Sequence, residues 1–460
     1  MLIYFLVVLL LILLIGSWFL FKKDIIQPSV IFVGMYFVST LCCVLNVNKW
    51  GVDMQWNTFF LLLIGAIHFV GISYGIKYLF DRKYGNVKVE EKNAEKKDKT
   101  NKKYLISTTL VLAIYNIIVI GLLVYNVNII ASKYGEFNSF SEMLTIYKDK
   151  TAYNKVDELP DYLTVMMKPI IASAYIFLFV FCKKIVTSKE KKKAVLKNLY
   201  MLIFPITYFI QRICESNRGS IMNFIASAFV MYILLWYIQN NWKKTVRLKN
   251  IGISLVCAMV LLTIFYFSAS LIGRINTKGM VDYITFYLGG SIECLNLRLN
   301  EEYIPDRNVP ATFANTIRDL NKLKITNIDI KYNSWEEFKY NGETMIGNIY
   351  TGYSNLIFDF GVVGVILFQT IIAVFFSIVY YIVKYIQIKD LYKNIIMIIY
   401  TYLIYTIVTH PMVPTFFEET FTIATIGVLM FFILIYTIVH PYQVKEEIGN
   451  IKSKLEKRKE

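Results

Sequence analysis

The chain has 460 residues, of which 56% are hydrophobic and only 18% are charged. Average soluble domains contain about 45–50% apolar and about 25% charged residues, and here the apolar residues form long uninterrupted runs. This composition excludes a soluble globular domain. It predicts an all-α, polytopic integral membrane protein that forms a single membrane domain over residues 1–460.

The formal net charge of +16 is concentrated in lysine-rich segments between apolar runs. Two of them stand out, one at residues 81–104 and one at residues 183–197. Basic loops of this kind follow the positive-inside rule, and a solvated charge run that touches an anionic leaflet explains them better than a nucleic-acid surface does. We therefore expect cytoplasmic loops at these positions and no nucleic-acid partner.

The sequence carries no recognisable cofactor or metal motif. Its six cysteines show no CxxC spacing, and no Walker A, HExxH or DxD motif is present. Zinc sites and nucleotide-dependent chemistry need such motifs. We expect no cofactor, no metal and no disulfide framework, and a metal-independent activity if the protein is an enzyme.

Eleven runs are long and apolar enough to be membrane-spanning helices, each needing about 20 residues. In chain order they lie near residues 2–21, 27–46, 58–80, 105–127, 163–182, 199–213, 220–238, 251–271, 354–383, 395–410 and 420–439. If the loop at 81–104 is inside, alternation predicts an outside N-terminus and a cytoplasmic tail at 440–460. The other basic loops then also fall inside.

The same alternation places one large loop, residues 272–353, outside the membrane. It mixes polar and aromatic residues, as a folded cap over a membrane cavity does. Its first part, MVDYITFYLGGSIECLNLRL at 280–299, is amphipathic and is interrupted by a pair of glycines. This stretch is expected to be an interfacial or re-entrant helix, not a twelfth span.

Charged residues cluster in QRICESNRGS at 211–220, on the outer side of the predicted sixth span. If the helix continues through this stretch, Arg212, Glu215 and Arg218 recur every three residues and share one face over about 9 Å. Two guanidinium groups separated by a carboxylate suit a diphosphate, because arginine binds phosphate in a bidentate manner. Glu215 would orient the arginines and is a candidate catalytic residue. The alternative is a structural ion pair whose charged ends reach water.

Two further arginines, Arg274 and Arg298, follow on the same outer side. Either could complete a basic, diphosphate-binding pocket around a lipid carrier. The alternative for each is an ordinary loop residue paired with a nearby acid.

His410 is the other catalytic candidate. It lies in THPMVPTFFEET, in a short outer turn between the last two predicted spans, with Glu418 and Glu419 nearby. A histidine with a pKa near 6.5 could act as a general base towards a sugar hydroxyl. The alternative is a capping or packing role.

Polar and aromatic residues also mark the outer start of the ninth predicted span, GNIYTGYSNLIFDFGVVGVILF at 347–368. Asn348, Tyr350 and Tyr353 could hydrogen-bond to sugars and stack on them, although an interfacial aromatic belt has the same composition. Asp359 lies inside the apolar run and is expected either to bind glycan or to make a helix contact.

These stretches resemble the Wzy-type oligosaccharide repeat unit polymerases of bacterial O-antigen, capsule and exopolysaccharide assembly. The resemblance rests on IIQPSVIFVGMYFVST, SNRGSIMNFIASAFVMYI, YLGGSIECLNLRLN and GNIYTGYSNLIFDFGVVGVILF. It implies a GT-C-like helical fold in the bacterial cytoplasmic membrane. It also implies transfer of a growing glycan from undecaprenyl diphosphate to a newly flipped, lipid-linked repeat unit, with the chain-length regulator and flippase of the pathway as possible partners.

Two other functions stay open from the sequence. A ligase of the O-antigen type would use similar outer arginines and an outer histidine but a different acceptor. A lipid-linked oligosaccharide flippase or other transporter would favour repeated halves and charges deep in the bundle, and neither feature is evident in the chain.

Overall fold

The computed structural model describes residues 1–85, 102–153, 156–247, 252, 259–260, 262–269, 279–301, 305–331 and 336–456. Over these residues the chain is almost entirely helical, and its two short strands, β1 (Lys339–Asn341) and β2 (Thr344–Gly347), form one antiparallel hairpin. The predicted all-α, polytopic membrane architecture is thereby supported.

Eight helical segments in the described part of the chain are long and apolar enough to cross a membrane. They are α1 (Leu2–Leu20), α4 (Trp56–Tyr84), α5 (Lys102–Ser132), α7 (Asp161–Thr187), α8 to α9 (Lys191–Asn198 and Ile203–Cys214, joined by η2, Leu199–Leu202), α10 (Arg218–Gln239), α14 (Tyr353–Tyr385) and α15 to α16 (Asp390–Leu403 and Tyr405–Val408). A ninth is possible if α18 (Ile423–Val439) and α19 (Pro441–Glu456), which meet at an angle of 89°, count as one broken span.

The expected total of eleven spans is not confirmed by this count. The second predicted span corresponds to α2 (Pro28–Val44), which is apolar but, at 17 residues, shorter than each of the eight candidates. Ten of the 21 residues of the eighth, 251–271, lie outside the described residues.

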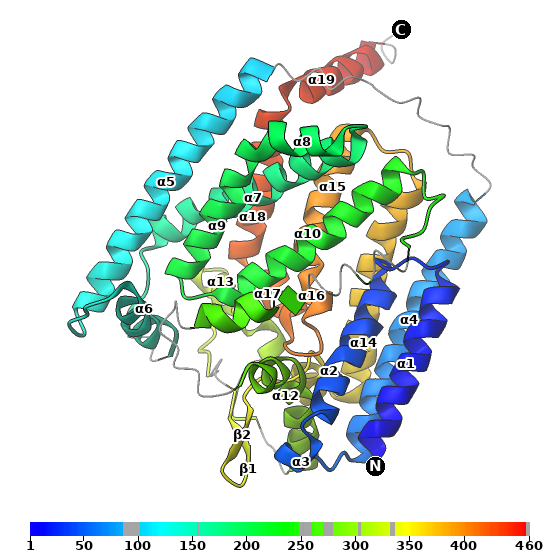
Figure 1. Ribbon diagram of the computed structural model, residues 1–460, viewed down its shortest axis with the longest axis vertical. Coiled ribbons are helices and arrows are strands. Elements are labelled where there is room, and N and C mark those ends of the chain that lie inside the picture. Colours follow the sequence, from blue (N-terminus) through cyan, green and yellow to red (C-terminus); the bar gives the residue numbers. More distant parts are fainter. Residues whose placement is uncertain are drawn as a thin grey trace.

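The long helices run between two ends of the molecule (Figure 1). One end, which we name the loop face, holds the N-terminus, α3 (Val47–Trp50), α6 (Phe140–Lys148), α12 (Met280–Asn300) and the β-hairpin. The opposite end, the basic face, holds α8, the α14–α15 turn and the C-terminal helix α19. The lysines of α8 therefore lie far from the large loop, as the predicted alternation requires.

Helix α12 is not among the spanning candidates in the described chain, in agreement with the expectation that it is not a further span. Figure 1 shows it nearly end-on beneath helices that run lengthwise. It packs closely against α2 at Gly289, where an added Cβ would lie 2.5 Å from the backbone nitrogen of Cys43. The glycine pair that interrupts the amphipathic stretch thus permits two backbones to touch.

Replacing Gly289 with alanine is expected to destabilise the protein by about 1–3 kcal/mol, because the new methyl group overlaps the α2 backbone. Gly121→Ala in α5 is the matched control, since an added Cβ there meets no atom within 4 Å. Thermal unfolding in detergent, followed by tryptophan fluorescence, should give a lower midpoint for Gly289→Ala only. Equal midpoints for the two variants would show that the helices do not cross this closely.

Candidate functional site

The structure corrects the predicted arrangement of the arginine cluster. Helix α9 ends at Cys214, Ser216 has a φ of 52°, and a new helix begins at Arg218. The side chain of Asn217 caps that new helix by accepting a hydrogen bond from the backbone of Ser220, at 3.3 Å. Because a helix end and an N-cap replace the expected continuous helix, the three charged residues do not share one helical face.

Arg212 and Glu215 nevertheless come together at the end of α9. Arg212 Nη1 lies 2.7 Å from Glu215 Oε2, and the two side chains are 15% and 16% exposed. The guanidinium also lies 5.0 Å from the centre of the Tyr208 ring. Its Nε is buried and has no hydrogen-bond partner in the described structure.

Arg218 points elsewhere, into an aromatic cluster. Its guanidinium lies 4.2 Å from the Phe265 ring centre and donates to the Phe265 carbonyl at 3.2 Å. It also donates to the hydroxyls of Tyr283 and Tyr287. Arg218 therefore fastens α10 to the start of α12, and the structure does not bring it to Glu215.

Arg298 lies near the end of α12 and is 1% exposed. Its guanidinium stacks on the Tyr350 ring at 3.3 Å, donates to Ser354 Oγ at 3.3 Å and pairs with Glu336 at 2.7 Å. The predicted sugar-binding face of Tyr350 is thus covered by Arg298. The remaining predicted arginine, Arg274, lies outside the described residues.

Asp359 makes the helix contact that the sequence left open as one of its two roles. Its carboxylate accepts hydrogen bonds from the backbone of Ala311 and Thr312, at 3.2 and 2.9 Å, and from the Thr312 hydroxyl at 2.7 Å. It also pairs with Arg307 at 2.6 Å. These bonds hold η3 (Ala311–Phe313) and α13 (Ala314–Lys322) of the cap against α14.

Replacing Asp359 with alanine is expected to destabilise the cap by about 3–5 kcal/mol, because Arg307 is only 10% exposed and would lose its anion. Asp282→Ala is the control, since its pair with Lys49 is nearly half exposed and such pairs contribute about 0–1 kcal/mol. Limited proteolysis of the purified protein should cut within residues 305–331 faster in Asp359→Ala only. Cleavage at the wild-type rate in both variants would rule out this tether.

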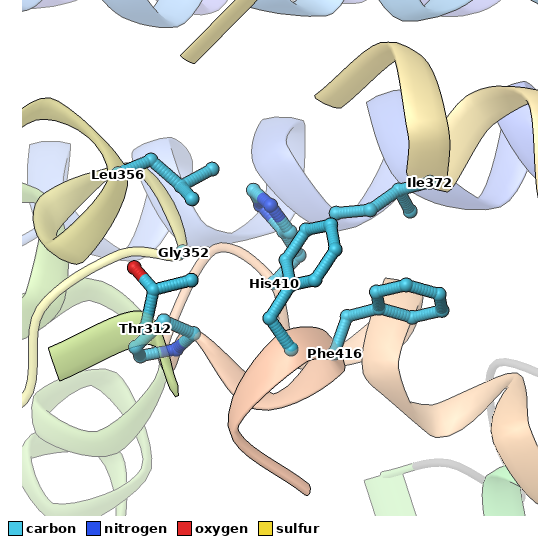
Figure 2. Close-up of a pocket in the computed structure, with 8 residues that line it drawn as sticks. Thr312, Gly352, Leu356, Ile372, His410 and Phe416 are labelled. Carbon is cyan, nitrogen blue, oxygen red and sulfur yellow. The ribbon is translucent and has the colours of Figure 1, made fainter. Parts of the chain in front are cut away.

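His410 is buried at 2% exposure in the turn after α16. Its Nδ1 lies 2.8 Å from the Tyr36 hydroxyl, and an added Cβ at Gly352 would lie 2.6 Å from its Nε2. Figure 2 shows Thr312, Leu356, Ile372 and Phe416 around the same pocket, whose volume is about 10 Å³. That volume holds about one water molecule and no sugar.

Burial lowers the pKa of His410 to about 3. A general base works best when its pKa is close to the working pH, so a neutral, enclosed His410 is poorly placed to accept a proton from substrate. Its contacts match the packing role that the sequence left as the alternative.

The other two glycan-binding candidates lie in the same region. Tyr353, the first residue of α14, is fully buried and its ring meets that of His410 edge-on at 5.1 Å. Asn348 follows β2 directly and is half-buried. Of the predicted sugar-binding residues, Tyr350 and Tyr353 are buried, whereas Asn348 and Asp359 are partly exposed, Asp359 with a side chain that is only 2% exposed.

Glu418 and Glu419, which have no role in the sequence-based prediction, lie on the short helix α17 (Thr415–Thr420). Asn355 donates a hydrogen bond to Glu418. Burial raises the pKa of the Glu418 carboxyl to about 8, although the hydrogen bond from Asn355 acts to lower that pKa. Tyr405 donates to Glu419. Glu419 has an exposed fraction of its surface, but the protein around its carboxyl removes water from it and so raises its pKa. The hydrogen bond from Tyr405 and the charge of Arg212 both act to lower that pKa.

The two glutamates of α17 therefore interact with groups from two distant parts of the chain. Glu419 feels the charge of Arg212, while Glu418 bonds to Asn355, whose neighbour Ser354 accepts from Arg298. We name this set of residues the α17 seam. Its members are Arg212, Glu215, Arg298, Ser354, Asn355, Tyr405, Glu418 and Glu419.

The seam contains both acidic and basic groups but no metal site. In the part of the chain that the structure describes, no group of three or more His, Cys, Asp or Glu residues could hold a metal ion. The seam combines the guanidinium of Arg212, which is 15% exposed, with the Glu418 carboxyl, whose pKa is raised to about 8.

Comparison of the chain with protein-family models, curated proteins and solved structures finds no match.

Proposed function

We propose that the protein is a metal-independent glycosyltransferase of the oligosaccharide repeat unit polymerase type. It transfers a growing glycan from a lipid diphosphate to the lipid-linked repeat unit that extends it. The observation that carries this proposal is the α17 seam, where Glu419 feels the charge of Arg212 and Glu418 bonds to Asn355, the neighbour of the Ser354 that accepts from Arg298.

The reaction needs one group for the departing diphosphate and one for the acceptor proton. An acceptor hydroxyl attacks the anomeric carbon of the donor, the bond from that carbon to the diphosphate oxygen breaks, and the diphosphate leaves with the electron pair. Arg212, whose side chain is 15% exposed, stabilises the charge that develops on the diphosphate through its guanidinium. Glu215 holds the guanidinium in place.

Glu418 takes the proton of the acceptor hydroxyl in this scheme. Its pKa of about 8 lies close to physiological pH, whereas that of His410 lies near 3. Matching of pKa to working pH favours the glutamate as the base. His410 is assigned to packing, which replaces the base role expected from the sequence.

The proposal places the loop face outside and the basic face in the cytoplasm of a bacterial cell, so that the N-terminus is outside and the C-terminus inside. Lysines on α8 at the basic face support this orientation through the positive-inside rule. The lipid carrier would be undecaprenyl diphosphate, and a chain-length regulator and a flippase would act beside the protein.

Purified protein in detergent, given a lipid-diphosphate-linked oligosaccharide, tests the proposal directly. A polymerase converts it into a ladder of longer lipid-linked glycans, which gel electrophoresis and mass spectrometry resolve. A flippase changes nothing without a second compartment, and a ligase transfers the glycan only to a different acceptor. An unchanged substrate would refute the proposed activity.

A further inference from the structure

A second polar pocket lies at the loop face, apart from the α17 seam. It has a volume of about 240 Å³ and lies between the segment after α3 and the second half of α12. Six of its eight lining residues carry a carboxyl or a carboxamide, and the proposed reaction uses none of them. The lining residues are Gly51, Asp53, Gln55, Glu293, Asn296, Leu297, Asn300 and Glu301.

The sequence of α12 explains why one helix serves two sites. Glu293, Asn296 and Asn300 are spaced by three and four residues, which places them on one helical face. Arg298 follows Asn296 by two residues, so it lies roughly 200° further round the helix at about 100° per residue. One face of α12 thus lines the pocket, while Arg298, on the opposite face, belongs to the α17 seam.

Asn296 gives the pocket a fixed frame. Its Nδ2 donates to the Asp53 carbonyl at 3.0 Å and to Glu293 Oε2 at 3.2 Å, and its Oδ1 accepts from the Gln55 backbone at 3.0 Å. Asn296 and Glu293 are 2% and 1% exposed. A pocket whose polar walls are already held in place loses little freedom on binding.

The charges on the walls favour a ligand rich in hydroxyl groups. Glu301 is balanced by Lys339, and burial raises the pKa of Glu293 to about 8, so that this side chain is mostly neutral at pH 7 and has a proton to donate. Asp53 accepts from Gln55 at 3.1 Å and keeps acceptor capacity. The described residues contain no cluster suited to a metal ion.

We propose that this pocket binds one sugar residue of the lipid-linked glycan, with Asp53, Glu293 and Asn300 as hydrogen-bond partners of its hydroxyl groups. This inference rests on the proposed function and names where part of its substrate is held. The volume lies below the range of about 300–1,000 Å³ typical of drug-sized ligands, which limits the occupant to a single ring.

Direct binding to the purified full-length protein tests the inference without reference to catalysis. The probes are methyl glycosides of glucose, galactose, N-acetylglucosamine and N-acetylgalactosamine, followed by saturation-transfer NMR. At least one glycoside should bind the wild type. Asn300→Trp, which fills the pocket from an exposed position, should weaken that binding at least tenfold.

Asp53→Ala should weaken binding to a similar degree, because it removes the carboxylate but keeps the carbonyl that Asn296 uses. The control is Asn138→Trp, which adds the same side chain at an exposed asparagine preceding α6. It should bind as the wild type does. Equal thermal unfolding midpoints for the three variants and the wild type show that the fold is retained.

Three outcomes would overturn the inference: no glycoside binds the wild type, Asn300→Trp binds as well as Asn138→Trp does, or Mg²⁺ or Ca²⁺ displaces the glycoside. Failure of the proposed function is a separate result. If glycosides bind but lipid-linked repeats give no polymer, the sugar pocket is supported and the polymerase activity is refuted. If polymer forms without glycoside binding at this pocket, the polymerase activity is supported and the sugar pocket is refuted.

Discussion

Replacing Arg212 with alanine is expected to lower the rate of polymer formation by about 100- to 1,000-fold, the range for losing one preorganised charge donor. Arg212 is a buried cation of the α17 seam, with a donor that lacks a partner in the described structure. Without it, the departing diphosphate has no charge partner from α9. Cells carrying the variant should accumulate glycolipid with a single repeat unit, visible by electrophoresis of extracted glycolipids.

Two controls separate a lost reaction from a lost fold. Arg82→Ala removes an arginine from the end of α4, and polymer length should not change. Because removing Arg212 alone leaves Glu215 without its partner, Arg212→Met combined with Glu215→Gln removes both charges and keeps side-chain volume. This double variant should unfold at the wild-type temperature and still make no polymer. A wild-type distribution of chain lengths from Arg212→Ala would exclude its assigned role.

Replacing Glu418 with glutamine is expected to lower the rate by about 100- to 10,000-fold, the usual contribution of general acid–base catalysis. Since a base must be ionised to act, wild-type activity should rise with pH and level off above about pH 8, the pKa to which burial raises this carboxyl. The residual activity of Glu418→Gln should lack that rise. His410→Gln, in contrast, should keep the wild-type pH profile even if the change costs stability.

Glu418 also makes stability depend on pH. Its pKa is about 8 in the folded protein and near the ordinary value of 4.5 in the unfolded chain, so folding favours the protonated form. The stability that Glu418 contributes through its raised pKa is fully present below about pH 4.5 and is lost as pH rises towards 8. Glu418→Gln should therefore gain thermal stability relative to the wild type as pH increases. A difference between the two proteins that does not change with pH would contradict the raised pKa.

Much of the fold follows from the sequence because spanning helices need long apolar runs. Each predicted run that lies in the described residues coincides with a helix, including the short α2. The exact count does not follow, since length and composition alone place α2 and the bent α18–α19 pair at the limit of what can span.

The site was harder to predict, because it depends on which helices meet. The stretch ESNRGS gave a usable signal, since Asn217 before Arg218 is a favourable N-cap that ends the continuous helix assumed for the arginine cluster. The effect of the Arg212 charge on Glu419 had no such signal, since the two residues are 207 positions apart in the chain. Two adjacent acids in an apolar turn, as in TFFEET, were the available hint.

We propose that the protein breaks one bond between the donor glycan's anomeric carbon and its diphosphate for each glycosidic bond that it makes. Purified protein and a radiolabelled lipid-linked repeat unit in detergent allow both products to be counted in one reaction. The account predicts one undecaprenyl diphosphate released for every repeat added, with both products lost in the Arg212→Met, Glu215→Gln variant. Chain extension without release of the lipid diphosphate, or release without extension, would contradict it.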